Sequence, residues 1–123
     1  MEQYKQGDIV WTDLTVPDAT LVKDFYKAVT GWEVKPLSMG EYDDYVMETT
    51  EGTGVAGVCH ARGSNANIPP QWLVYVAVED VEGAAKRCTE MGGKVLDGPR
   101  KMGDKDFACI QDPAGAVLAL ISL

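Results

Sequence analysis

An internal repeat is the sequence feature that most limits how this chain can fold. A run with alternating apolar residues leads into an Asp, then an amphipathic helix pattern, then a glycine, and this succession occurs twice. Asp80 and Gly93 lie 62 residues after Asp18 and Gly31, an offset of about half of the 123-residue chain. Each Asp is placed to cap a helix N-terminus, and each Gly to end a helix in the left-handed conformation. The repeat therefore predicts two modules of the same topology.

Three short strand patterns follow each predicted helix. They cover residues 33–37, 42–49 and 53–61 in the first module, and 94–96, 107–111 and 116–122 in the second. The sequence thus predicts an α+β fold of two tandem βαβββ modules, over about 8–61 and 72–123, joined by an exposed connector over about 62–71 that is rich in Gly, Asn, Ser and Pro. Each sheet would have one face against its helix and one bare face. The modules are therefore expected to form a cup-shaped mixed sheet, whose mouth suits a small molecule.

Charge and composition exclude several classes of partner. The net charge of -8 argues against nucleic acid, because phosphate binding rests on clustered Lys and Arg. No apolar run approaches the roughly 20 residues of a membrane span, and residues 1–8 lack the apolar core of a signal peptide. The three cysteines have no spacing that indicates a disulfide framework or a zinc motif. We expect a cytoplasmic protein with neither a membrane nor a nucleic-acid partner.

Several short motifs occur in a recognisable order. Residues 10–18 read Val-Trp-Thr-Asp-Leu-Thr-Val-Pro-Asp, residues 31–32 Gly-Trp, residues 72–80 Trp-Leu-Val-Tyr-Val-Ala-Val-Glu-Asp, and residues 112–115 Asp-Pro-Ala-Gly. In this order the chain resembles the glyoxalase, bleomycin-resistance and extradiol-dioxygenase proteins, the vicinal oxygen chelate superfamily. The resemblance extends over essentially the whole chain. It implies a single glyoxalase-like domain over residues 1–123 with the vicinal oxygen chelate fold.

The resemblance also implies where a metal would bind. In the metal enzymes of this superfamily, His and Glu ligands lie seven residues before each helix-capping Asp and seven after the Asp of the Asp-Pro turn. Here those positions are Trp11, Leu73 and Ala119, whose side chains cannot coordinate a divalent cation. The remaining ligand would lie on the strand over 53–60. We therefore expect no metal and no other cofactor, and no glyoxalase I activity.

Strand alternation predicts which residues face the cup. If Trp11 faces the cup, as the resemblance implies, alternation also places Asp13 there, with Val10, Leu14 and Val16 on the helix side. The predicted ligand-binding residues are Trp11, Asp13, Leu73, Tyr75 and Ala119. This lining suits an apolar or aromatic ligand that carries one polar group, or a cation held by Trp11 and Asp13. Asp13 could equally form an ion pair with a cationic side chain.

Three functions agree with these features. The first is a metal-free binding protein of the glyoxalase and bleomycin-resistance type, which sequesters or senses a small organic molecule. The second is a lyase, isomerase or dioxygenase-type enzyme with Asp13 or His60 as base, or with Asp13, Glu48 and His60 as unorthodox metal ligands. The third is a dimeric interaction module whose cup is plugged by Trp11 and Tyr75. In each case a homodimer is expected, because pairing covers open sheet edges.

Three features outside the cup have simpler interpretations. His60, the single histidine, lies at a strand end and is interpreted as a solvated loop residue. The acidic group Glu41, Asp43 and Asp44 is interpreted as a solvated hairpin. Trp72 is out of phase with the cup and is expected to pack over the sheet edge or the helix.

Overall fold

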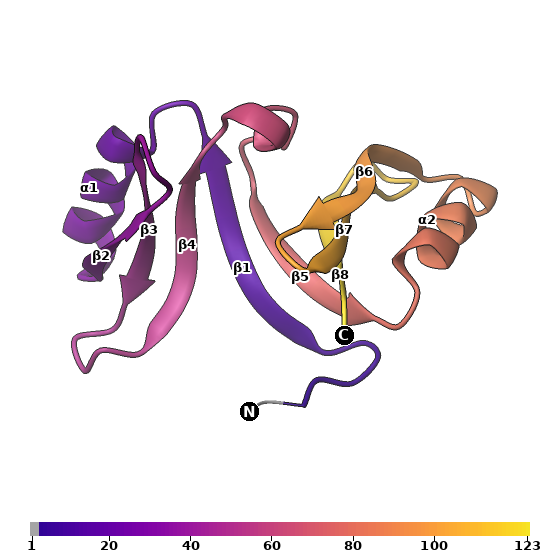
Figure 1. The fold of residues 1–123 in the computed structure, drawn as a ribbon, viewed down its shortest axis with the longest axis horizontal. Coiled ribbons are helices and arrows are strands. Elements are labelled where there is room, and N and C mark those ends of the chain that lie inside the picture. Colours follow the sequence, from indigo (N-terminus) through magenta and orange to yellow (C-terminus); the bar gives the residue numbers. More distant parts are fainter. Residues whose placement is uncertain (1–2) are drawn as a thin grey trace. The chain divides into compact units, whose positions relative to one another are not determined.

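The computed structural model describes residues 3–123 as eight strands, two α-helices and one 3₁₀ turn (Figure 1). The chain divides into two compact units. The N-terminal unit is Thr12–Trp72, and the C-terminal unit joins Leu73–Leu123 to the chain before Thr12. The elements are β1 (Ile9–Val16), α1 (Ala19–Thr30), β2 (Glu33–Ser38), β3 (Asp43–Glu48), β4 (Gly54–His60), β5 (Trp72–Val78), α2 (Val81–Glu90), β6 (Lys94–Met102), β7 (Lys105–Gln111) and β8 (Val117–Ser122). The predicted α+β class and the βαβββ order of each half are confirmed.

The first helix begins and ends where its cap residues predict. The Asp18 carboxylate accepts a hydrogen bond from the backbone N–H of Leu21 at 3.1 Å. Gly31 has φ 81° and donates its N–H to the Lys27 carbonyl, which closes the last turn. Because both caps were read from residue type and spacing alone, they show how local chemistry sets the limits of α1.

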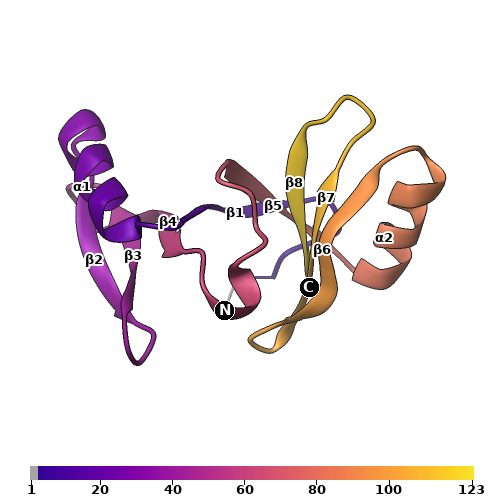
Figure 2. The same ribbon diagram turned by 90° about the horizontal axis from the view of Figure 1, so that it is seen from above.

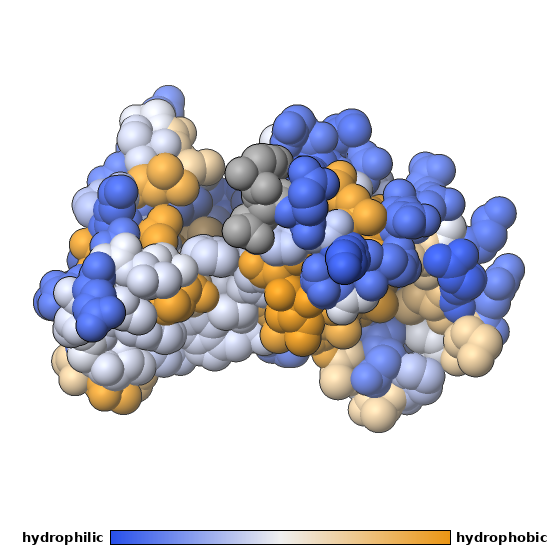
Figure 3. All heavy atoms as spheres, turned by 90° about the horizontal axis from the view of Figure 1, so that it is seen from below, coloured by the Kyte–Doolittle hydropathy of each residue, from blue (hydrophilic) through white to orange (hydrophobic). Residues whose placement is uncertain are grey.

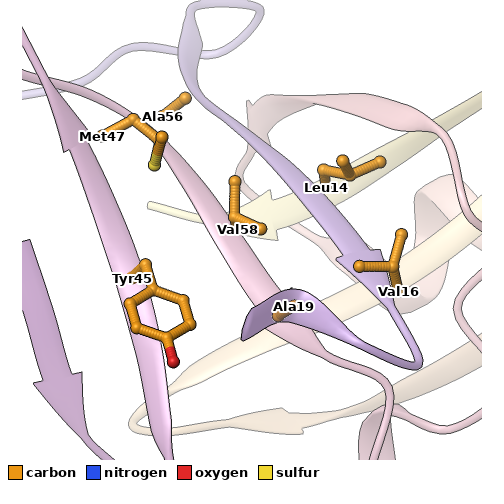
Figure 4. Packing of buried hydrophobic residues seen from close by; sticks show 7 residues of the cluster. All are labelled: Leu14, Val16, Ala19, Tyr45, Met47, Ala56 and Val58. Atoms are coloured by element: carbon orange, nitrogen blue, oxygen red, sulfur yellow. The ribbon is translucent and has the colours of Figure 1, made fainter. Parts of the chain in front are cut away.

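Packing in the N-terminal unit follows strand alternation. Its strands lie in the order β2-β3-β4-β1, with β1 parallel to β4 and the other neighbours antiparallel. Helix α1 covers one face of these strands (Figure 2). The core beneath it consists of Leu14, Val16, Ala19, Tyr45, Met47, Ala56 and Val58 (Figure 4). The predicted inward positions on β1, Leu14 and Val16, are therefore confirmed.

The C-terminal unit repeats this plan and adds the start of the chain. Its strands lie in the order β5-β8-β7-β6, with β5 parallel to β8. Val78, Val81, Ala108 and Leu120 form the core on the α2 side. Before β1, Gly7 donates its N–H to the Ala77 carbonyl and Asp8 accepts from the Ala77 N–H, both at 2.8 Å. This unit is thus assembled from two stretches that are distant in the sequence.

The second helix ends differently from the first. Its left-handed residue is Gly92, with φ 96°, while Gly93 is required for a separate reason. A Cβ atom on Gly93 would lie 2.6 Å from the Cys88 Sγ and 2.6 Å from the Gln111 carbonyl oxygen. Gly31 and Gly93 are equivalent in the repeat but not in function: the first supplies a backbone conformation and the second supplies space.

Two predicted segments differ from the structure. Strand β6 runs on to Met102, well past the predicted end at residue 96, because register shifts beside Asp97 carry the pairing through Gly98 and Pro99. The connector is not wholly exposed, since Ile68 is buried. Neither helix in the described part of the chain, residues 3–123, is long and apolar enough to cross a membrane.

Candidate functional site

The predicted ligand-binding residues of the C-terminal unit lie on the face of its sheet that points away from α2, here called the α2-distal face. Val76 and Val78 pack on the α2 side, so Leu73, Tyr75 and Ala77 point the other way. The register pairs Tyr75 with Ala119 and Ala77 with Ile121, which places all four on that face. The structure therefore brings three predicted residues, Leu73, Tyr75 and Ala119, together.

That part of the α2-distal face is filled by protein. Leu73, Tyr75 and Ala119 are each at most 4% exposed. The Tyr75 ring lies 5.9 Å from the fully buried Phe107 ring, centroid to centroid. A ligand therefore cannot contact Leu73 or Ala119 without displacing side chains.

An ion pair that the sequence analysis missed borders this cluster. The Arg100 guanidinium donates to the Asp97 carboxylate through Nε and Nη2, both at 2.9 Å. It also lies 4.8 Å from the centre of the Phe107 ring. The hydrogen bonds that Arg100 donates to Asp97 raise the pKa of Arg100, so this side chain stays positively charged. The sequence analysis misses this pair because it ends the strand at residue 96, whereas β6 continues to Met102 and brings Asp97 and Arg100 together.

The two most buried thiols are unsuited to nucleophilic chemistry. Burial raises the pKa of Cys109 to about 11, with the Asp97 charge adding to the effect and Arg100 opposing it. Burial likewise raises the pKa of Cys59, and the charges of Asp13 and Asp44 act in the same direction. A thiol in this state is almost entirely protonated at neutral pH.

These thiols should make the protein less stable in alkali. The ordinary pKa of a cysteine thiol is 9.0, and below that pH the Cys109 thiol keeps its proton in both the folded and the unfolded state. Above it the unfolded chain loses this proton first, because the folded-state pKa is about 11. The free energy of unfolding therefore falls as the pH rises from 9 towards about 11. The urea midpoint of the wild type should therefore drop between pH 8.5 and 10.5, and the drop should be smaller in Cys109→Ala. An equal fall of the urea midpoint in the wild type and in Cys109→Ala would contradict the raised pKa of Cys109.

His60 and Asp44 are not solvated, contrary to the prediction. The exposed fractions of their side chains are only 13% and 7%. The Asp44 carboxylate accepts the His60 backbone N–H at 2.8 Å and lies 3.4 Å from the imidazole Nδ1. The prediction is wrong because the acidic residues are not all in one hairpin turn: β3 begins at Asp43, and strand alternation turns the next side chain, Asp44, inward.

The residues proposed as unorthodox metal ligands lie apart. In the N-terminal unit, Glu48 is in register with Gly54, whereas His60 ends the same strand, β4. Six residues of strand span about 20 Å, so Glu48 and His60 cannot bind one ion. Asp13 lies between them in register, opposite Gly57. Within residues 3–123 no three His, Cys, Asp or Glu side chains are grouped to hold a metal.

The family's usual metal positions do not fit a metal either. Trp11, Leu73 and Ala119 carry no carboxylate, imidazole or thiolate donor. Leu73 and Ala119 are also buried in apolar surroundings. These three side chains therefore cannot hold a divalent metal ion.

A hollow of about 400 Å³ lies in the C-terminal unit, beyond the filled part of the α2-distal face. It is lined by Gln3, Tyr4, Val10, Ala77, Lys105, Ile121, Ser122 and Leu123. Ala77 and Ile121 follow Tyr75 and Ala119 by two residues on their strands, so the hollow continues the predicted face. Figure 3 views the molecule from below and shows apolar surface, in orange, exposed among hydrophilic side chains.

The lining of this hollow corrects one prediction and adds a charge. Val10 was expected on the helix side with Leu14 and Val16, but it lines the hollow because the start of β1 belongs to the C-terminal unit. Lys105 is the single charged side chain of the lining, and it forms no ion pair with residues 3–123. The hollow can therefore hold an apolar body with an anionic or hydrogen-bonding group beside Lys105.

Comparison with known proteins defines the class. The model of the Glyoxalase/Bleomycin resistance protein/Dioxygenase superfamily matches residues 8–120, and the chain belongs to this superfamily. It is 33% identical over 122 residues to "Putative glyoxylase CFP32" of Mycobacterium bovis, covering 96% of this chain and 46% of the relative. It is 29% identical over 133 residues to the anthracycline biosynthesis protein DnrV of Streptomyces peucetius, covering 98% of this chain and 48% of DnrV. The chain thus spans about half the length of these curated relatives.

Solved structures agree with this class at the level of the fold. Methylmalonyl-CoA epimerase from Mycobacterium tuberculosis superposes with a TM-score of 0.57 at 11% identity, over 99% of this chain and 92% of the epimerase. A superfamily member from Vibrio splendidus gives a TM-score of 0.57 at 16% identity, over 92% of this chain and 97% of that one. The fold predicted from the motifs is thereby confirmed.

Proposed function

We propose that this protein binds a small apolar or aromatic molecule in the hollow of the C-terminal unit, without a metal, and acts by sequestration or sensing. The observation that carries the proposal is an apolar hollow lined by one cationic side chain, Lys105, which forms no ion pair within residues 3–123. An acidic or strongly polar group of the ligand would lie against the Lys105 ammonium. The ligand is therefore expected to be neutral or anionic, whereas the sequence analysis also allowed a cation held by Trp11 and Asp13.

Two further facts support this proposal over an enzyme. Asp13 and His60, the candidate bases, are not among the residues that line the hollow. His60 also lies 3.4 Å from the Asp44 carboxylate, and Glu48 is in register with the opposite end of β4 from His60, so the proposed metal ligands cannot share one ion. The name of DnrV places that relative in anthracycline biosynthesis, which is compatible with a planar aromatic ligand for a chain of this type.

A fluorescent aromatic sulfonate, 1-anilinonaphthalene-8-sulfonate, tests the hollow directly. The wild type should bind one molecule per chain in a saturable titration. Lys105→Gln should weaken this binding by about fivefold, the size expected for losing one partly exposed charge contact. Lys94→Gln, which removes an exposed lysine outside the hollow, should leave it unchanged. Non-saturable binding, or equal affinities in the two variants, would overturn the assignment.

Metal content tests the second part of the proposal. Protein purified without chelator and dialysed against nickel, zinc, manganese or iron should retain less than about a tenth of an equivalent, because Trp11, Leu73 and Ala119 offer no donor atoms. Elemental analysis measures this directly. One tightly held ion per chain would contradict a metal-free protein, whatever the result of the dye titration.

A further inference from the structure

The floor of the hollow is an apolar row with a cation at one end. Its residues come from four strands that are neighbours in the sheet: Val10 on β1, Ala77 on β5, Ile121 on β8 and Lys105 on β7. Neighbouring strands lie about 4.8 Å apart, so this row extends over roughly 14 Å. We call Val10, Ala77 and Ile121 the apolar floor. A ligand whose apolar body covers this floor has its polar group at the Lys105 end.

No side-chain carboxylate of the described lining competes for the Lys105 ammonium. Among residues 3–123, those that line the hollow include no Asp and no Glu. Asp106, the next residue along β7, forms its ion pair with Lys101 at 2.8 Å, and strand alternation turns its side chain to the other face. The net charge of -8 acts from further away, and at physiological salt charges more than about 8 Å apart are largely screened. The lining therefore favours an anionic group.

The second polar group at this end of the hollow is a hydroxyl. Ser122 also lines the hollow, and its Oγ accepts the backbone N–H of Asp106 at 2.8 Å. A hydroxyl that accepts in this way still has its own proton to donate, and a lysine ammonium can only donate. The Lys105 end therefore offers donors to two acceptor oxygens, and it suits a group that carries no N–H or O–H of its own.

The start of the chain adds an aromatic wall. Tyr4 lines the hollow and is 47% exposed. The residues after it are fixed to β5: Gln6 Oε1 accepts the Glu79 N–H at 2.6 Å, and Gly7 donates its N–H to the Ala77 carbonyl at 2.8 Å. Because Ala77 is itself part of the apolar floor, these bonds hold Tyr4 close to the floor. A phenol ring in this place can stack on a planar aromatic molecule.

We propose that the ligand of the hollow is a planar aromatic carboxylate. Its carboxylate oxygens accept hydrogen bonds from the Lys105 ammonium and the Ser122 hydroxyl, and its ring lies against Tyr4 and the apolar floor. One lysine balances one negative charge, so a carboxylate fits this end better than a phosphate monoester, which carries nearly two. This inference rests on the proposed function, because it names the class of molecule that the same hollow takes up.

Three molecules with the same ring system test the class by displacing bound 1-anilinonaphthalene-8-sulfonate. Naphthalene-2-carboxylate should bind about tenfold more tightly than naphthalene-2-carboxamide, because the amide has no charge and turns N–H donors towards donors. Naphthalen-2-ylmethylammonium should displace the dye least, because its charge would lie beside Lys105. Saturable dye binding with equal affinities for the carboxylate and the carboxamide would overturn this inference and leave the proposed function standing. Absence of saturable dye binding would overturn both.

Two variants separate the role of the charge from that of the ring. Lys105→Gln should lower the affinity for the carboxylate to that for the carboxamide, so the selectivity disappears. Tyr4→Leu should weaken both compounds by about fivefold and keep their ratio, because stacking does not depend on the carboxylate charge. Phe25→Leu is the matched control for Tyr4→Leu, because Phe25 is 57% exposed but lies on α1, and it should leave both affinities unchanged.

The ratio of the two affinities is the deciding quantity. A variant that is partly unfolded loses affinity for the carboxylate and the carboxamide alike, so the ratio reports only on recognition of the polar group. Selectivity that survives in Lys105→Gln, or that disappears in Tyr4→Leu, would overturn the proposed arrangement of the ligand.

Discussion

Replacing Phe107 by alanine should lower the free energy of unfolding by about 3 to 5 kcal/mol, the range for a large aromatic residue removed from a core. Phe107 is fully buried, on β7 between the Tyr75 ring and the Arg100 guanidinium. Its loss leaves a cavity beside a charged group that has packed against the ring. Urea denaturation followed by circular dichroism measures the change.

The chain supplies its own control for this substitution. Phe25 is the other of its two phenylalanines, and its side chain is 57% exposed. Phe25→Ala, measured at a concentration where chains do not associate, should cost less than about 1 kcal/mol. Similar losses in the two variants would mean that Phe107 is not packed as described. Phe107→Leu should fall between them, because it restores part of the volume.

Replacing Gly93 by alanine should cost about 2 to 4 kcal/mol, through overlap with atoms that cannot easily move. The added Cβ would lie 2.6 Å from the Gln111 carbonyl oxygen, which belongs to the backbone of β7. It would also lie 2.6 Å from the Cys88 Sγ on α2. These overlaps can be relieved only if the end of α2 moves away from the sheet. Thermal unfolding measures the loss as a lower midpoint.

Gly31→Ala is the matched control, at the equivalent position of the repeat. Apart from its chain neighbours, no atom of residues 3–123 lies within 4 Å of the place a Cβ would take there, so only the φ of 81° opposes the substitution. That conformation costs alanine roughly 1 to 2 kcal/mol. The double substitution Gly93→Ala and Cys88→Ala should recover part of the loss at Gly93. A loss at Gly93 no larger than that at Gly31 would contradict the close approach.

The sequence predicts the fold of this chain well where local chemistry decides it. The caps at Asp18, Asp80 and Gly31 depend on residues within one helical turn, so spacing was enough to find them. Strand alternation likewise placed Leu14 and Val16 against α1. It failed for Val10 on the same strand, because β1 begins in one unit and ends in the other.

The site was less predictable, since it depends on contacts between distant segments. Leu73, Tyr75 and Ala119 are together as expected, but other residues fill the space around them. The hollow begins two residues further along β5 and β8, at Ala77 and Ile121. Its lining also includes Tyr4 and Lys105, which belong to no motif in the sequence. His60 could not be placed from its position at a strand end, because its contact with Asp44 spans 16 residues.

The division of β1 between the units bears on how the chain folds during synthesis. The N-terminal unit is one continuous stretch, Thr12–Trp72, so all of it has been made before β5 is complete. The segment before Thr12 must wait, because its hydrogen-bond partner Ala77 emerges only later. At roughly 5 to 20 residues per second, residues 73–123 take some seconds to follow. During that interval the nascent chain should hold one folded unit, while the segment before Thr12 still lacks the backbone hydrogen bonds that Ala77 provides.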